Sequence, residues 1–178
     1  MKIYLTRHGQ TDWNIARKVS GVTNIQLTDT GRAQARALGE KIRDEGIPIG
    51  RIITSDLDRA AETGDIVGGI IGVPVQRDPR LRERDFGTVE GTSYDDAIFK
   101  DNNYEMARKI GGGESVLKMA QRIYNFLDEL PEKYPDETIL LVGHGAMGRV
   151  VHTYFNSLSN EEYSRVRLGN CELRAYDL

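Results

Sequence analysis

Two histidines, two arginines and one glutamate stand at positions where an α/β protein could build a catalytic site. Arg7 and His8 directly follow the apolar run Ile3-Tyr4-Leu5, which predicts a buried strand. The planar guanidinium of arginine suits phosphate oxygens, and histidine can act as a nucleophile or as an acid and base. Ligands of open α/β sheets bind at the carboxyl ends of the strands. We therefore expect Arg7 and His8 to face a ligand, with Gly9 allowing a close approach of the backbone.

Two later segments repeat this arrangement of a polar side chain after a strand. Arg59 follows the short apolar run 52–54 and falls in the first turns of the next predicted helix. Glu83 follows a third strand candidate, Val75-Gln76. Arg59 adds a second positive charge to the site, and Glu83 adds a proton donor. The alternative interpretation of Glu83 is a solvent-exposed charge cluster with the neighbouring arginines 80, 82 and 84.

A second histidine completes the pattern. His144 lies between Gly143 and Gly145, directly after the most apolar strand candidate, 138–142. A helix that begins there would direct free N–H groups, Gly145 among the first, and the positive end of its dipole toward an anion. Two arginines, two histidines and a helix N-terminus are the parts of a phosphate-binding pocket.

The elements that must position these residues alternate between strands and helices. Thr28 is a candidate N-cap for a helix with Ala33, Ala37, Leu38 and Ile42 on one face, and Ser55 for a helix that includes Ala60, Val67 and Ile71. Residues 116–130 form an amphipathic pattern that stops at Pro131, residues 150–158 predict another helix, and residues 171–178 alternate like a strand. This alternation predicts an α/β sandwich with a largely parallel central sheet. The polar stretch at about 92–112 predicts short helices that form a small lid.

Composition limits the possible functions. The 178 residues, 39% hydrophobic and 29% charged, suit a single globular domain over residues 1–178. A net charge of −3 argues against a nucleic-acid-binding or membrane surface. Cys171 is the only cysteine, no signal peptide is recognisable, and the longest apolar run is far too short to cross a bilayer, so we expect a cytoplasmic protein.

Four motifs in this order resemble the histidine phosphatase superfamily, also called the phosphoglycerate mutase-like family. They begin at Thr6-Arg7-His8-Gly9, Ser55-Asp56-Leu57-Asp58-Arg59, Leu81-Arg82-Glu83-Arg84 and Gly143-His144-Gly145. The resemblance implies a three-layer α/β/α fold. It also implies that His8 is the nucleophile that becomes phosphohistidine, that Arg7, Arg59 and His144 hold the phosphoryl group, and that Glu83 is the acid and base. Asn14 matches a further phosphate contact of the family, and 112–115 matches a stretch that is architectural.

The chemistry of these roles agrees with the residue types. Arg7 and Arg59 would neutralise charge on the phosphoryl oxygens, and their positive field should keep His8 neutral and nucleophilic. Glu83 would protonate the departing oxygen and then deprotonate the attacking water. The sequence has no carboxylate cluster with metal-ligand spacing and no GxxxxGK[ST] loop, so we expect no metal and no cofactor.

Three functions fit the pattern. The favoured one is a phosphomonoesterase that acts on a small phosphorylated metabolite and releases inorganic phosphate. The second is a mutase, which needs extra cations and a closing lid to retain its intermediate. The predicted lid contains three basic residues, Lys100, Arg108 and Lys109, and four acidic ones, and this charge balance disfavours a mutase. The position of Arg84 after Glu83 nevertheless resembles the mutase motif. The third is a non-enzymatic phospho-ligand-binding module, which would lack His8, Arg59 or Glu83. The natural substrate and the oligomeric state stay open.

Overall fold

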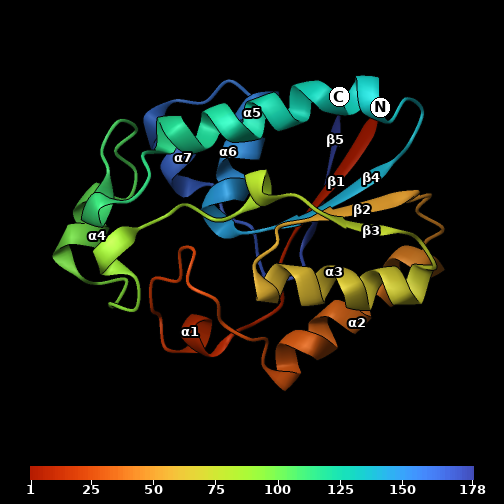
Figure 1. Ribbon diagram of the computed structural model, residues 1–178, viewed down its shortest axis with the longest axis horizontal. Coiled ribbons are helices and arrows are strands. Elements are labelled where there is room, and N and C mark those ends of the chain that lie inside the picture. The colour runs from red at the N-terminus through yellow and green to blue at the C-terminus, as the bar shows by residue number, and fades with distance from the viewer.

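A five-stranded sheet in the order β3-β2-β4-β1-β5 forms the centre of the computed structural model, which describes residues 1–178 (Figure 1). The strands are β1 (Lys2–Arg7), β2 (Arg51–Thr54), β3 (Val75–Arg77), β4 (Ile139–Gly143) and β5 (Leu173–Asp177). The first four are mutually parallel, and β5 runs antiparallel to β1 at the edge. The expected largely parallel sheet is confirmed.

Helices cover both faces of this sheet and complete the predicted three layers. α2 (Asp29–Asp44) and α3 (Asp58–Ile71) lie on one face, and α5 (Val116–Lys133), α6 (Gly145–Phe155) and α7 (Asn160–Arg165) lie on the other (Figure 1). Strand β4 is buried throughout because it contacts both layers. Its residues Ile139 and Leu141 belong to the core beneath α5 and α6, whereas Leu140 and Val142 belong to the core beneath α2 and α3.

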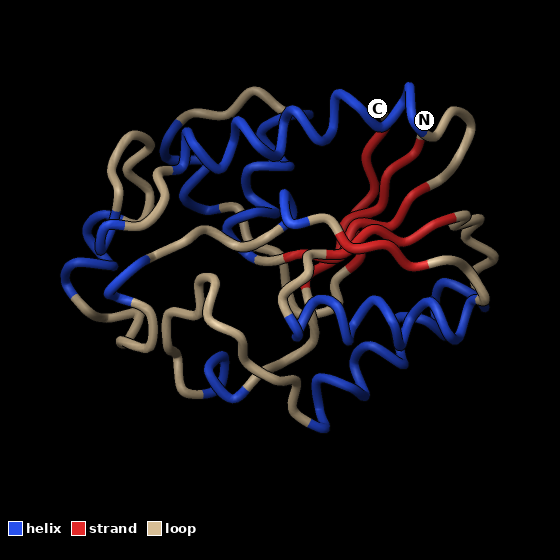
Figure 2. Tube along the Cα trace, viewed as in Figure 1, coloured by secondary structure: helices blue, strands red, loops and turns tan.

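Loops and short helices gather at the carboxyl ends of the parallel strands (Figure 2). They include α1 (Asp12–Ile15), α4 (Ala97–Asn102) and short 3-10 turns at 87–89 and 110–112. The short helices expected near 92–112 are therefore present. Two glycine-rich segments pack together there: a Cβ on Gly113 would lie 2.2 Å from the carbonyl oxygen of Asp85, and one on Gly87 would lie 2.0 Å from that of Gly111. The expected architectural role of 112–115 fits this close packing.

The helix faces differ in part from those that the sequence predicts. In α2 the buried residues include Ala35, Leu38 and Ile42, whereas Ala33 and Ala37 are exposed. Their assignment to the core was wrong, because alanine is compatible with either side of a helix and the period must be fixed by the larger side chains. The predicted faces of α3 and α5 are buried or half-buried as expected.

Three predicted helix ends were also wrong. Ser55 is not the N-cap of α3, because its hydroxyl accepts the N–H of Leu57, and Leu57 is the cap residue. Helix α5 continues through Pro131 to Lys133, since a proline near the end of a helix removes only one hydrogen bond. Helix α6 ends at Phe155, so Leu158 lies outside it. No helix is both long and apolar enough to span a membrane.

Candidate active site

The register of the sheet brings the four predicted motifs together. Arg7 pairs with Gly143 across β1 and β4, so His8 and His144 leave adjacent strands at the same level. Thr54 pairs with Val142 across β2 and β4, so the chain that leads to Arg59 starts at the same edge. The rings of His8 and His144 lie 5.3 Å apart, centroid to centroid. The convergence predicted from strand ends is thus present in the structure.

His8 is held with one ring nitrogen presented to the interior of the site. Its Nδ1 lies 2.7 Å from the carbonyl oxygen of Gly9, which can only accept a hydrogen bond, so Nδ1 carries the proton. Nε2 is then an acceptor, and Arg59 Nε donates to it at 3.2 Å. Burial, followed by the charges of Arg59 and Arg7, holds the pKa of His8 well below its usual range. The expected neutral imidazole is supported, with burial as the larger cause of the lowered pKa.

Arg59 is fully buried and fixed on three sides. Besides its contact with His8, its Nη1 donates to the carbonyl oxygen of Thr23 at 2.9 Å and its Nη2 to that of Gly21 at 2.6 Å. Burial lowers the pKa of Arg59 to about 10, so the guanidinium is charged at neutral pH. Arg7 reaches the carbonyl oxygen of Leu168 at 3.4 Å, and its buried Nε has no hydrogen-bond partner. Donors of Arg7 are therefore free for a ligand.

The loop that orients Arg59 is itself held by a residue that sequence reasoning missed. The carboxylate of Glu90 accepts the backbone N–H of Val22 at 2.9 Å and that of Thr23 at 2.8 Å. It also accepts the N–H of Phe86 at 3.1 Å. No local motif links 21–23 to 86–90, so the role of Glu90 in holding this loop becomes visible only in the three-dimensional structure.

His144 is fully buried and lies beside His8. Neither of its ring nitrogens has a hydrogen-bond partner in the protein. Burial and then the nearby charge of Arg59 hold the pKa of His144 well below its usual range. A neutral imidazole carries one N–H donor, and an unpartnered buried donor beside two arginines is suited to an oxygen of a bound anion.

Glu83 is fixed at the N-terminus of α6. Its Oε2 accepts the N–H of Ala146 at 2.9 Å, and its Oε1 accepts those of Met147 at 3.0 Å and Arg84 at 2.9 Å. The sequence predicted that the first N–H groups of this helix point at a ligand. In the structure two of them donate to the carboxylate of Glu83 instead. Gly145 still lines the cavity.

The neighbouring arginines do not form a solvated cluster with Glu83. Arg80 pairs with Asp78 and Glu129, and Arg82 pairs with Asp56. Arg84 is fully buried and donates to three backbone carbonyls of the region 103–114. The resemblance of Arg84 to a mutase motif thus corresponds here to a structural contact.

Two other residues that the sequence assigned to ligand contact, Asn14 and Gly9, have close protein contacts in the structure. Asn14 does not line the cavity, and its Oδ1 accepts the N–H of Thr11 at 3.1 Å in the capping box of α1. Gly9 approaches protein rather than ligand, since a Cβ there would lie 2.3 Å from the carbonyl oxygen of Gly31. Short polar motifs of this kind serve local structure as readily as they bind a ligand.

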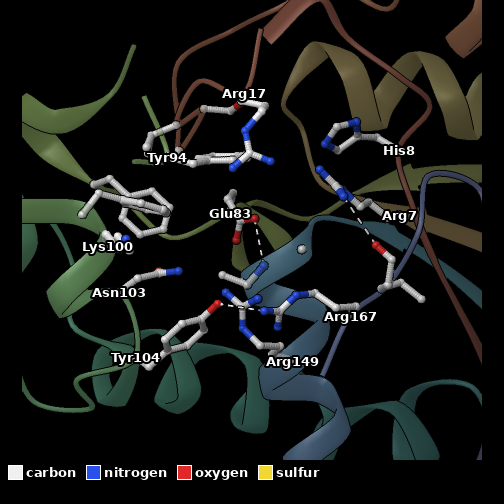
Figure 3. A pocket seen from close by; sticks show the side chains of 18 of the residues that line it. Arg7, His8, Arg17, Glu83, Tyr94, Lys100, Asn103, Tyr104, Arg149 and Arg167 are labelled. Atoms are coloured by element: carbon white, nitrogen blue, oxygen red, sulfur yellow. Dashed lines mark hydrogen bonds between the residues drawn. The ribbon is translucent and has the colours of Figure 1, made fainter. Parts of the chain in front are cut away.

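A cavity of about 440 Å³ opens in front of His8, large enough for a small metabolite. Figure 3 shows His8 and Arg7 on one side, Glu83 in the middle, and Tyr104, Arg149 and Arg167 on the side away from His8. Aromatic rings of residues 86, 94 and 99 line another part of the wall.

The charge of this cavity differs from the charge that the lid sequence suggested. None of the acidic residues of 92–112 lines it, and Arg108 and Lys109 are exposed outside it, whereas Lys100 does line it. Glu83 is the only acidic lining residue, against the basic residues Arg7, Arg17, Arg59, Lys100, Arg149 and Arg167. The charge balance of the predicted lid is therefore not the charge balance of the cavity, because a charge count along the sequence ignores which side chains face inward.

No group of three or more histidine, cysteine, aspartate or glutamate side chains is placed to hold a metal ion. The site consists of imidazoles, guanidinium groups, one carboxylate and a helix N-terminus, which together suit an anionic ligand.

Comparisons with known proteins agree with this geometry. The chain is 36% identical to the probable phosphoglycerate mutase GpmB of Erwinia tasmaniensis, over 99% of this chain and 85% of that protein. It superimposes on mycobacterial glucosyl-3-phosphoglycerate phosphatase, solved with VO3, with a TM-score of 0.87 and 27% identity over 98% of this chain and 90% of that one. A phosphoserine phosphatase of Entamoeba histolytica, solved with 3-phosphoglyceric acid, gives a TM-score of 0.85 and 27% identity over 98% and 89%. The family model for the histidine phosphatase superfamily (branch 1) matches residues 3–178, and the chain belongs to that superfamily.

Proposed function

We propose that this protein is a phosphomonoesterase that hydrolyses a small phosphorylated metabolite through a phosphohistidine formed on Nε2 of His8. The observation that carries the proposal is the fixed tautomer of His8. Nδ1 is bound to the Gly9 carbonyl, and Nε2 accepts from Arg59 at a metabolite-sized cavity that Arg7 also lines. Such a nitrogen is a nucleophile without prior loss of a proton.

In the first step Nε2 attacks phosphorus, the P–N bond forms and the P–O ester bond breaks. Arg7, Arg59 and His144 donate to the phosphoryl oxygens, so that their negative charge is neutralised. Arg59 Nε must leave Nε2 for a phosphoryl oxygen, since the lone pair that accepts its hydrogen bond is the one that attacks. Glu83, in its protonated form, gives its proton to the departing oxygen.

In the second step a water molecule attacks the phosphohistidine. Glu83 takes a proton from that water, the P–N bond breaks, and inorganic phosphate leaves while His8 returns to its neutral form. We propose that neither step uses a metal ion, because the two arginines supply the positive charge. Turnover should therefore be unchanged by EDTA, and vanadate should inhibit at concentrations well below the KM. A strict requirement for added magnesium or zinc would refute this part of the proposal.

Phosphoglycerate mutase activity is the second candidate. The name of the Erwinia relative favours it, as do the additional cations in the cavity, which could retain a product while the phosphoryl group returns to another oxygen. The two phosphatases among the solved relatives favour hydrolysis.

Following 3-phosphoglycerate by NMR, with and without 2,3-bisphosphoglycerate, separates the two reactions. We expect inorganic phosphate as the main product and no dependence on the bisphosphate. Formation of 2-phosphoglycerate faster than release of phosphate would replace the phosphatase by the mutase.

A further inference from the structure

The part of the cavity away from His8 contains positive charge that no acidic group of the protein balances. Arg149 of α6, Arg167 beyond α7 and Lys100 of α4 all line the cavity. None of the three takes part in an ion pair with a carboxylate. Other arginines near the site do, for example Arg82 with Asp56 and Arg122 with Glu114. Arg149 is half-buried, whereas Lys100 and Arg167 are exposed. A cavity wall with three cations and no counter-charge indicates a place for an anion that the protein does not supply.

Arg149 is held against the rings of two tyrosines. Its guanidinium carbon lies 5.2 Å from the ring centre of Tyr104 and 5.9 Å from that of Tyr163. Its buried Nε has no hydrogen-bond partner. Contacts with ring faces fix a guanidinium in position without occupying its N–H groups, which point along the plane of the group.

Arg167 and Tyr104 extend this group of donors. Arg167 Nη1 donates to the carbonyl oxygens of Ser164 at 2.5 Å and Val166 at 2.9 Å, and Nη2 donates to the hydroxyl of Tyr104 at 3.2 Å, so its Nε and the second N–H of Nη2 have no partner in the protein. Because that hydroxyl accepts from Arg167, its own proton is free for a third group. Figure 3 shows Tyr104, Arg149 and Arg167 together in the lower part of the view, with His8 and Arg7 above them.

A buried acceptor lies on the same wall. Asn103 is 8% exposed, and its Oδ1 has no hydrogen-bond partner. Asn103 precedes Tyr104 in the chain, and its backbone carbonyl is held by the buried Arg84. The wall thus contains unpartnered groups that can bind an anion and a neighbouring hydroxyl of the same ligand.

We propose that Arg149 and Arg167, with Tyr104 and Lys100, form a second anion-binding site, and that the substrate is a phosphomonoester with a second anionic group, a carboxylate or a phosphate, at its other end. This inference rests on the proposed function, because it assigns the reacting phosphate to His8, Arg7 and Arg59. It goes beyond that function by naming the class of substrate and the residues that select it.

Three substrates with the same carbon chain test the second site. Glycerol 3-phosphate ends in a hydroxyl group, 3-phosphoglycerate ends in a carboxylate, and glycerol 1,3-bisphosphate ends in a phosphate. We expect kcat/KM for phosphate release to be roughly tenfold or more higher for at least one anionic substrate than for glycerol 3-phosphate, the usual effect of a charge-assisted hydrogen bond. The substrate with the larger preference identifies the second group as carboxylate or phosphate.

Variants of the far wall show which residues cause the preference. The ratio of kcat/KM for the anionic substrate to kcat/KM for glycerol 3-phosphate measures the preference. Arg149→Met or Arg167→Met should reduce this ratio roughly tenfold, and Arg149→Lys should reduce it less. Arg165→Met is the matched control, since Arg165 is exposed on α7 and pairs only with Glu161. It should leave the ratio unchanged.

Binding to an unreactive protein separates this inference from the proposed function. In a His8→Ala background, calorimetry should show tighter binding of the anionic ligand than of glycerol 3-phosphate, and adding Arg149→Met or Arg167→Met should remove the difference, whether or not the parent releases phosphate. Equal affinities for the three ligands would overturn the second site. The second site would also be overturned if neither Arg149→Met nor Arg167→Met changed the ratio of the kcat/KM values. A parent that binds selectively but never releases phosphate would overturn only the phosphatase function.

Discussion

At the scale of single residues, Glu83 has the position that most directly links structure to chemistry. Its carboxylate is fixed by three backbone N–H groups and lies between His8 and the far wall of the cavity (Figure 3). A group held in this way can exchange a proton with one defined oxygen of the substrate. Its contribution should therefore depend on how much the departing oxygen needs that proton.

Glu83→Gln should slow the phosphorylation of His8 according to the leaving group. Alkyl phosphates should lose about 10²–10⁴-fold in rate, whereas nitrophenyl phosphate should lose far less, because nitrophenolate leaves without protonation. Rapid-quench measurements of the first turnover compare the two substrates. Equal losses would mean that Glu83 only positions the phosphate or the backbone.

At the scale of elements, Arg84 joins the strand-end segment that carries Glu83 to the region that covers the cavity. Its guanidinium donates to the carbonyl oxygens of Asn103, Arg108 and Glu114 at 2.7 to 2.9 Å. These three carbonyls lie in a segment with little regular structure, so a single side chain ties together its beginning, middle and end.

Arg84→Met should lower the free energy of unfolding by roughly 3 kcal/mol, because it leaves buried carbonyl groups without donors. It should also increase hydrogen exchange in 103–114. Arg82→Met is the control, since Arg82 forms a surface ion pair with Asp56 and its loss should cost no more than about 1 kcal/mol. Urea unfolding of both variants measures the difference. Similar losses in the two variants would show that Arg84 does not hold the covering segment.

At the scale of the whole molecule, two buried neutral histidines make stability depend on pH. The folded protein holds the pKa values of His8 and His144 well below the usual range, whereas in the unfolded chain both return to ~6.5. As the pH falls below ~6.5, the unfolded state binds protons that the folded state does not, so stability decreases.

Between pH 7 and pH 5.5 the free energy of unfolding should fall by about 1 kcal/mol for each of these histidines. His144→Gln should remove its share of that decrease. His152→Gln should remove less, because His152 lies nearer to solvent and its pKa is lowered less strongly. Urea unfolding at the two pH values measures this decrease in the free energy of unfolding. The same decrease in His144→Gln as in the parent would contradict a lowered pKa of His144.

The sequence predicted the sheet and the inner half of the site because strong local signals mark them. Apolar runs locate β1, β2 and β4, and strand ends then place His8, Arg59 and His144 at one edge. The second half of the site could not be predicted in this way. Arg149 and Arg167 lie in or near helices, where an arginine is normally a surface residue, and only the structure shows that both contact Tyr104 at the cavity wall.

Other predicted site residues have protein partners that the sequence did not indicate. The side chain of Asn14 caps a helix instead of reaching the cavity, Gly9 contacts Gly31, and the N-terminus of α6 binds Glu83. In each case the motif does mark backbone N–H donors or a close approach of two backbone segments. Tertiary structure decides whether a ligand or another part of the protein is the partner.

The central claim is that Nε2 of His8 accepts the phosphoryl group during turnover. The most direct test is rapid mixing of the protein with a phosphomonoester substrate, quenching under alkaline conditions within the first turnover, and peptide mapping by mass spectrometry. We predict one added phosphoryl group on His8, labile in acid, which disappears as phosphate is released and is absent in His8→Ala. An acid-stable label, or the same label in His8→Ala, would contradict the account.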